Sequence, residues 1–221
     1  MSFGIVVRVK GEYALFTRPE MKVERVSYDV PTPSAARGII EAIYWKPAIR
    51  WVIDRIHILN PIIFTNIRRN EVSDKVPYST ARSLMQGTIK KDFYLDILSS
   101  RQQRASMVLK DVDYVFEAHF EIMPENAGPE DTAEKHYNIA LRRLRKGQHY
   151  TQPVLGTREF PASVSLIEDG NIPTSQNTGE QDLGWMLYDM DYRDPENISP
   201  YFFKARMVDG IIDLRNVVKA S

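Results

Sequence analysis

The chain has 221 residues, of which 43% are hydrophobic, and its 29 Lys and Arg balance its 29 Asp and Glu. This length predicts one full hydrophobic core with a small appendage, and the absence of cysteine excludes disulfides and thiolate-bound zinc or iron–sulfur sites. No stretch approaches the roughly 20 apolar residues of a membrane span and no signal-peptide core opens the chain, so we expect a soluble cytoplasmic protein.

The N-terminal part predicts a strand and then a helix. Residues 3–10 are rich in β-branched side chains and are closed by a glycine, which is typical of a strand that 13–16 extends after a kink. Prolines favour an irregular connection over 17–33. Apolar residues at helical spacing then predict a helix over 35–45, and a Lys-Pro step ends it because a residue before proline is driven out of the α region.

Two long strands follow, with an insertion between them. Residues 48–59 are dense in Ile, Val and Trp and predict a central strand, whereas 112–122 alternate apolar and polar side chains, the clearest strand pattern in the chain. The segment 61–106 predicts only short strands at 62–64 and 93–98. Since a structureless loop of that length is unusual, we interpret it as an inserted hairpin or a mobile RNA-facing arm.

Residues 131–146 predict a second helix with one basic face. Asp131 is a good N-cap and Glu134 completes a capping-box pair, so the helix should begin near Thr132. An apolar stripe is formed by Tyr137, Ala140, Leu141 and Leu144, and a polar stripe by Lys135, Asn138, Arg142 and Arg145. The result is a cationic ridge with Lys135 and His136 at its N-terminal end.

The order of the elements predicts an α+β fold. A strand over 153–160 completes strand, helix, strand, strand, helix, strand, the ferredoxin-like (RRM-like) βαββαβ arrangement. Beyond it only strands are expected, including a hairpin around the type I′ turn signal Asp209-Gly210. We therefore expect a ferredoxin-like domain over 1–160, with the insertion at about 61–106, and a small antiparallel β domain over 161–221.

Four segments in this order resemble a known family. They are YALF (13–16), IYWKP (43–47), KHY (135–137) and LGTREFP (155–161). Together they resemble the type I-C CRISPR-associated endoribonuclease, which belongs to the fifth Cas family of the RAMP superfamily. The resemblance covers most of 11–161. It implies a metal-independent RNase that cuts the CRISPR repeat transcript (pre-crRNA) at the 3′ base of its stem-loop, and then stays on the 5′ handle of the crRNA with other subunits of a type I-C surveillance complex.

The resemblance also implies the catalytic residues Tyr44, Lys135 and His136. Their chemistry fits self-cleavage of RNA by an internal 2′-hydroxyl. His136, with an ordinary pKa of roughly 6.5, can act as base or acid, and Lys135 can place a cation on the phosphorane oxygens. Tyr44 can orient the 2′-hydroxyl or donate a proton, and the sequence leaves its role open, as it does the choice between base and acid for His136. No metal or other cofactor is expected.

The remaining polar residues suggest RNA contacts. The predicted phosphate-binding residues are Arg142, Arg143, Arg145, Lys146, His149 and Arg158. A basic helix face is more often plain solvated surface, and that reading stays open. Two other functions also stay open: a subunit that binds the crRNA handle without cutting it, and a scaffold whose acidic C-terminal part contacts proteins. His57 is expected to be packed in its strand and His119 to lie on the polar side of its own.

Overall fold

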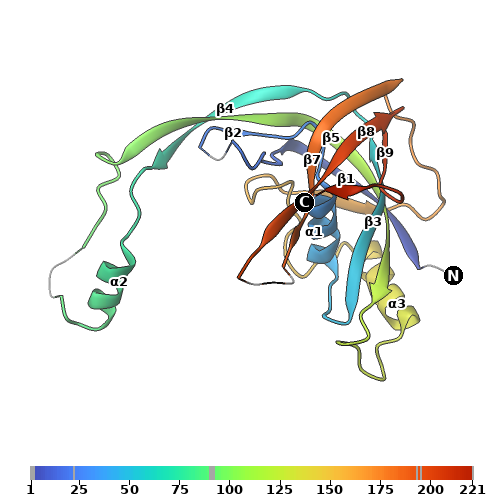
Figure 1. The fold of residues 1–221 in the computed structure, drawn as a ribbon, viewed down its shortest axis with the longest axis horizontal. Helices are drawn as coiled ribbons and strands as arrows, with labels where there is room; N and C mark the ends of the chain where they lie inside the picture. The colour runs from blue at the N-terminus through green and yellow to red at the C-terminus, as the bar shows by residue number, and fades with distance from the viewer. Residues whose placement is uncertain (1–2, 22, 90–92, 193, 195, 221) are drawn as a thin grey trace.

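The computed structural model describes residues 3–21, 23–89, 93–192, 194 and 196–220. Over these residues the chain is a mixed α/β fold, with three helices and one mostly antiparallel sheet (Figure 1). None of the helices in the described part is long and apolar enough to cross a membrane. The same residues contain no group of three His, Asp or Glu side chains placed to hold a metal ion.

Four strands form the centre of the sheet in the order β3-β5-β1-β6, and each is antiparallel to its neighbours. They are β1 (Gly4–Ala14), β3 (Ile49–Ile58), β5 (Arg101–Ile122) and β6 (Ser163–Leu166). The expected kink in the first strand is wrong, because β1 continues through Gly11, which pairs with Val112 of β5. A Cβ atom at Gly11 would lie 2.2 Å from the Leu155 side chain, so close packing rather than chain reversal requires glycine there.

Two helices pack on this sheet and against each other: α1 (Pro33–Ile43) contacts β3, and α3 (Ala133–Arg145) contacts β6. Both predicted helices are confirmed, each displaced by one or two residues at its ends. Buried residues of α1 recur at i, i+3, i+4 and i+7, from Ala36 to Ile43, as expected for one apolar face. The contact between the helices brings the C-terminal end of α1 beside α3.

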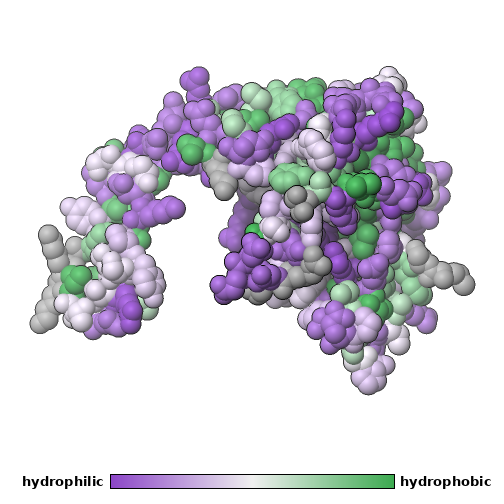
Figure 2. All heavy atoms as spheres, in the orientation of Figure 1, coloured by the Kyte–Doolittle hydropathy of each residue, from purple (hydrophilic) through white to green (hydrophobic). Residues whose placement is uncertain are grey.

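The insertion forms an arm that projects from the body. β4 (Phe64–Val72) pairs with the first nine residues of β5, and α2 (Tyr78–Met85) lies in the connection at the tip (Figure 1). The interpretation as an inserted hairpin is confirmed, but the short strands at 62–64 and 93–98 are wrong. Their local pattern was weak because the side chains of β4 are only exposed or half-buried and α2 buries no residue, and hydrophilic side chains cover much of the arm near the body (Figure 2). The short β2 (Arg25–Val26) also joins β5, in parallel.

The predicted strand at 153–160 is wrong, and β6 takes its place beside β1. Residues 154–161 instead form a loop closed by an isolated bridge between Val154 and Pro161. Gly156 adopts a φ of +89° and passes so close to Leu15 that a Cβ atom would lie 2.0 Å from the Leu15 carbonyl oxygen. A strand is excluded there because the backbone must turn at Gly156.

The C-terminal strands extend the same sheet through the pairing of β9 with β3. They are β7 (Glu180–Asp191), β8 (Ser199–Val208), β9 (Ile211–Asp213) and β10 (Lys219–Ala220). The predicted hairpin is confirmed, since Asp209 and Gly210 have φ values of +48° and +76°, as a type I′ turn requires. The division into domains at 160/161 stays a prediction.

Candidate active site

Tyr44 is positioned by the end of α1. It is the first residue after the helix, with an extended backbone, and its N–H still donates to the Ile40 carbonyl at 3.1 Å. The indole N–H of Trp51 donates to the Tyr44 carbonyl oxygen at 2.8 Å. The backbone of Tyr44 is therefore held from both sides, and its side chain is directed toward α3.

His136 lies on the buried face of α3, not on the cationic ridge where the sequence placed it. It shares that face with Ala140 and Leu144, at a spacing of four residues, which is the spacing of a helix face. The N-cap is Thr132, whose hydroxyl accepts the N–H of Lys135 at 3.3 Å, so the expectation that Asp131 caps the helix is wrong. Asp131 is thereby free to face the side chains of the first turn.

The side chains of Tyr44 and His136 form a direct hydrogen bond. The Tyr44 hydroxyl lies 2.7 Å from Nδ1 of His136. Nε2 of His136 lies 3.3 Å from Oδ1 of Asp131, close enough for an ion pair but without the alignment of a hydrogen bond, and it is otherwise buried and unpaired. Because Asp131 favours a hydrogen on Nε2, we assign the tautomer in which Nδ1 accepts the phenol O–H.

Burial determines the protonation of this pair. The side chain of His136 is 1% exposed and Tyr44 is 2% exposed. Burial lowers the pKa of His136 below its ordinary 6.5, although the Asp131 carboxylate opposes that shift, and burial raises the pKa of Tyr44. At neutral pH the imidazole is therefore uncharged and able to accept a proton, and the phenol keeps its own.

Lys135 stands beside the pair at the surface. Its ammonium lies 3.7 Å from Oδ1 of Asp131 and 3.9 Å from Glu130, and its side chain is 43% exposed. A backbone hydrogen bond from Gly128, together with Lys135 and His136, lowers the pKa of Asp131, so this carboxylate is charged at neutral pH. Asp131 was not among the site residues predicted from the sequence. Its position five residues before His136 and at the helix start was the available signal.

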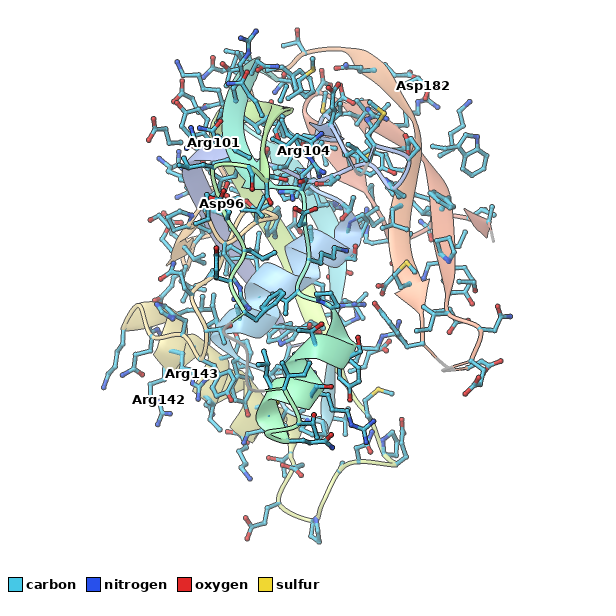
Figure 3. All side chains as sticks on the ribbon, turned by 90° about the vertical axis from the view of Figure 1, so that its left-hand side faces the viewer. Asp96, Arg101, Arg104, Arg142, Arg143 and Asp182 are labelled. Atoms are coloured by element: carbon cyan, nitrogen blue, oxygen red, sulfur yellow. The ribbon has the colours of Figure 1, made fainter. Side chains whose placement is uncertain are left out.

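The cationic ridge divides into residues with and without internal partners. Arg143 donates to the Ile43 carbonyl oxygen at 2.7 Å and its guanidinium carbon lies 5.2 Å from the centre of the Tyr44 ring, so it supports the active site. Arg145 forms an exposed ion pair with Glu168. Arg142 and Lys146 are exposed and have no ion pair among the described residues. Figure 3 shows Arg142 on the outer side of α3.

The other two predicted RNA contacts lie in different places. His149 is exposed in the loop after α3, near the end of α1. Arg158 is exposed in the loop that packs against Leu15, after the last residue of β1. The first residues of β1 lie near the start of α3, where the rings of Phe3 and Tyr137 are 5.2 Å apart. Arg158 is therefore at the opposite end of β1 from the Tyr44–His136 pair.

The two strand histidines have internal partners away from α3. His57 is buried, as expected, and its Nε2 lies 2.7 Å from Glu117. His119 is partly exposed on the polar side of β5, as expected, and lies 2.9 Å from Asp54. Neither of these two side chains faces Tyr44 or Lys135. Of His57, His119 and His136, only His136 lies with the other proposed catalytic residues.

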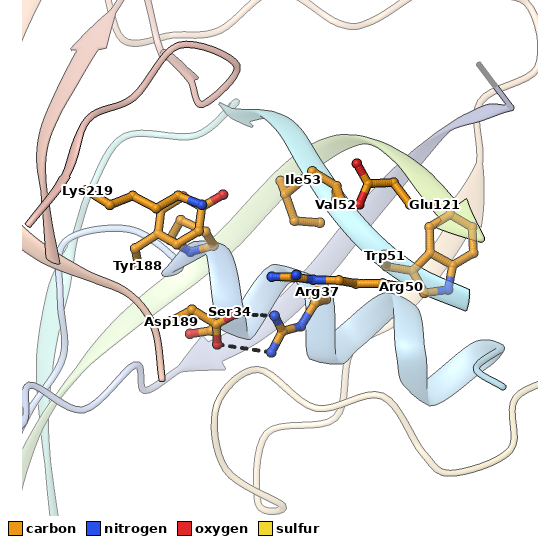
Figure 4. Close-up of a pocket in the computed structure, with 11 residues that line it drawn as sticks. Ser34, Arg37, Arg50, Trp51, Val52, Ile53, Glu121, Tyr188, Asp189 and Lys219 are labelled. Atoms are coloured by element: carbon orange, nitrogen blue, oxygen red, sulfur yellow. Dashed lines mark hydrogen bonds and ion pairs between the residues drawn. The ribbon is translucent and has the colours of Figure 1, made fainter. Parts of the chain in front are cut away.

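A separate pocket lies between α1, β3 and the C-terminal strands (Figure 4). Arg37 of α1 forms two hydrogen bonds with Asp189 of β7 across it. The Lys219 ammonium lies 4.0 Å from the centre of the Tyr188 ring. These cations already have partners within the protein, so the pocket is a junction between α1 and the C-terminal strands.

Comparison with known proteins gives the family. A sequence model described as "CRISPR-associated protein (Cas_Cas5)" matches residues 4–215. The chain belongs to this CRISPR-associated family. It is 50% identical over 218 residues to the "CRISPR pre-crRNA endoribonuclease Cas5d" of Mannheimia succiniciproducens, covering 97% of this chain and 96% of that one.

Solved structures of CRISPR-associated proteins share the fold. A "CRISPR-associated Protein" crystal structure superposes with a TM-score of 0.71 and 26% identity, over 99% of this chain and 96% of that one. A chain of a "CRISPR RNA-guided surveillance complex" matches with a TM-score of 0.50 and 14% identity, over 98% and 90% of the two chains. The family resemblance expected from the four short motifs is confirmed over nearly the whole sequence.

Proposed function

We propose that this chain is a metal-independent pre-crRNA endoribonuclease that cleaves CRISPR repeat RNA at the 3′ base of the stem-loop. The observation that carries the proposal is the 2.7 Å hydrogen bond between Tyr44 and Nδ1 of His136, with the cation of Lys135 beside it. The 50% identity to a pre-crRNA endoribonuclease over nearly its full length supports the same activity. The proposed catalytic residues are Tyr44, Lys135 and His136.

The proposed fold of the RNA-binding part is the ferredoxin-like core. The sequence order β1, α1, β3, β5, α3, β6 and the sheet order β3-β5-β1-β6 support it, because this is the βαββαβ pattern with two helices packed on an antiparallel sheet. The core ends with β6, later than the strand that the sequence predicted. The arm formed by β4 and α2 is an insertion between the second and third core strands.

The proposed reaction is attack by the adjacent 2′-hydroxyl. As its oxygen bonds to phosphorus, its proton passes to the Tyr44 oxygen while the phenol proton passes to Nδ1 of His136. The bond from phosphorus to the 5′-oxygen breaks and that oxygen takes a proton from solvent, which leaves a 2′,3′-cyclic phosphate and a 5′-hydroxyl. Lys135 stabilises the charge on the phosphorane, and Asp131 orients the imidazole.

Access to this pair requires a local movement. Tyr44 and His136 are almost fully buried, and Asp131, from the segment before α3, faces Nε2. We propose that RNA displaces this segment and draws Lys135 and Asp131 apart. The same burial favours a second candidate function, a subunit that binds the crRNA handle and does not cut it.

We propose further that the product stays bound by its 5′ handle in a surveillance complex with other type I-C subunits, in the cytoplasm. The likeness in fold to a chain of a surveillance complex supports this assembly. Arg142 and Lys146, the ridge residues without internal ion pairs, are the proposed phosphate contacts on the outer face of α3.

The test is cleavage of end-labelled repeat RNA in EDTA. Cleavage with a 2′,3′-cyclic phosphate product, abolished by one 2′-deoxy nucleotide just upstream of the cut but with binding retained, is the expected result. Strict dependence on magnesium or cutting of the deoxy substrate contradicts the mechanism. Tight binding without cleavage supports the handle-binding alternative.

A further inference from the structure

A groove of about 540 Å³ opens beside the C-terminal end of α1. Two large aromatic side chains line it and are strongly exposed: Trp45 is 51% exposed and Tyr150 is 83% exposed. Aromatic side chains of this size usually bury most of their surface, because that burial stabilises the fold. Two of them exposed in one concave site indicate a binding surface.

The groove is built on a fixed backbone. The N–H groups of Tyr150 and Thr151 both donate to the Ala42 carbonyl oxygen, at 2.8 and 3.1 Å. The loop after α3 is therefore anchored to the last turn of α1, while the ring of Tyr150 remains in solvent. Trp45 follows Tyr44 directly, and Arg143, which also lines the groove, lies over the Tyr44 ring, so the groove is near the ring of the proposed catalytic residue.

The charges of the groove suit a phosphate. Lys46 and Arg143 line it. The single acid in its lining, Glu41, already lies 3.4 Å from Arg37 in an ion pair. Arg143 also lies over the Tyr44 ring, so a phosphate bound by this guanidinium would sit close to the reacting group. Lys46 is also near enough to contribute to the lowered pKa of His136, after the larger effect of burial.

We propose that this groove holds one unpaired nucleotide next to the scissile phosphate, with its base stacked on Trp45 and Tyr150 and its phosphate between Lys46 and Arg143. The inference rests on the proposed endoribonuclease function and names a subsite of it. Aromatic rings stack on any base, whereas a cation pair at one end fixes the backbone, and this combination is typical of single-stranded RNA sites. An exposed Trp next to the catalytic residue therefore positions the strand for cleavage.

The experiment uses repeat RNA made uncleavable by one 2′-deoxy nucleotide, with 2-aminopurine placed in turn at each unpaired position flanking the cut. With the wild-type protein, we expect fluorescence at one position to be quenched by stacking. Trp45→Ala should reduce that quenching and weaken binding about fivefold or more, as loss of a base stack does. Trp45→Phe should restore part of both effects. Trp185→Ala is the matched control, because Trp185 is 59% exposed on β7, outside the groove.

An abasic site at the quenched position isolates the contact. In the wild type it should weaken binding at least as much as Trp45→Ala does, and in Trp45→Ala, where only Tyr150 can still stack on the base, it should cost less than in the wild type. If the two losses add, or if no position is quenched while the wild type still binds and cuts repeat RNA, the groove proposal is overturned and the proposed function stands. A wild-type protein that neither binds nor cuts repeat RNA overturns both.

Discussion

At the scale of single residues, the site depends on two neutral groups held in contact by the fold. Burial lowers the pKa of His136 and raises that of Tyr44, so at neutral pH the imidazole can accept the proton that the phenol carries. Asp131 is the charged group that selects the tautomer. The catalytic competence of the pair therefore depends on its environment and not on either side chain alone.

The first prediction separates chemistry from binding. His136→Ala should lower the single-turnover cleavage rate by roughly 10²-fold or more and change the Kd for uncleavable repeat RNA by only a few-fold, because the imidazole acts in the transition state. Tyr44→Phe keeps the ring under Arg143 but loses the hydrogen bond, and should lose rate in the same way.

The matched control for this prediction is His119→Ala, a partly exposed histidine whose partner is Asp54. It should cleave at the wild-type rate. If circular dichroism shows that the His136→Ala protein is folded and this protein still cuts like the wild type, His136 is not a catalytic residue.

The second prediction concerns pH. If neutral His136 accepts the proton, the cleavage rate rises as pH increases through its pKa, which lies below 6.5. Asp131 raises this pKa, whereas burial, Lys135 and Lys46 lower it. Asp131→Asn removes the carboxylate, so the rising limb of the pH–rate profile should move to lower pH. A limb that stays in place or moves upward would show that His136 is not the base.

At the scale of elements, the two faces of α3 have different functions. Its buried face carries His136 toward α1, and its outer face carries the ridge cations, of which Arg143 and Arg145 already have protein partners. The ridge therefore has fewer cations without a protein partner than the sequence suggested.

The third prediction ranks these cations. Arg142→Ala should weaken binding of repeat RNA and lower the slope of log affinity against log salt by up to about one. Arg145→Ala should do less, because Glu168 already neutralises that guanidinium. Arg206→Ala, on β8 and paired with Glu180, provides the control and should leave the slope unchanged. Equal slopes for all variants would show that the ridge is ordinary solvated surface and does not bind phosphate.

At the scale of the whole molecule, one ion pair joins α1 to the C-terminal strands. Arg37 and Asp189 make two hydrogen bonds, and both side chains are mostly buried (Figure 4). Because α1 also carries Tyr44 at its end, this junction supports the position of the site within the sheet.

The fourth prediction measures that junction. Asp189→Asn should lower the free energy of unfolding by roughly 1–3 kcal/mol, because it removes the charged partner of both guanidinium hydrogen bonds and, among the described residues, leaves the partly buried Arg37 with only Glu41 at 3.4 Å. Glu180→Gln breaks the exposed pair with Arg206 and should cost less than Asp189→Asn does. Thermal unfolding of the two variants compares them directly, and equal losses would show that the junction contributes no more than surface charge.

Much of the fold follows from local sequence. The alternation over 112–122, the helical spacing in α1 and α3 and the Asp209-Gly210 turn each predicted the observed element, because they reflect backbone preferences within a few residues. The insertion was harder to predict, since β4 and α2 contain no buried side chain and so leave little hydrophobic pattern. The loop over 154–161 was misread because its turn depends on the approach of Gly156 to Leu15.

By itself, the sequence determined the family and the residue types of the site, through four short motifs and a basic helix. Only the tertiary structure decided that His136 faces inward, that Tyr44 meets it across 92 residues of chain, and that Arg143 lies over the Tyr44 ring. The physical reason is that local spacing sets which side chains share a face. Which face is buried, and against what partner, depends on how distant elements pack together.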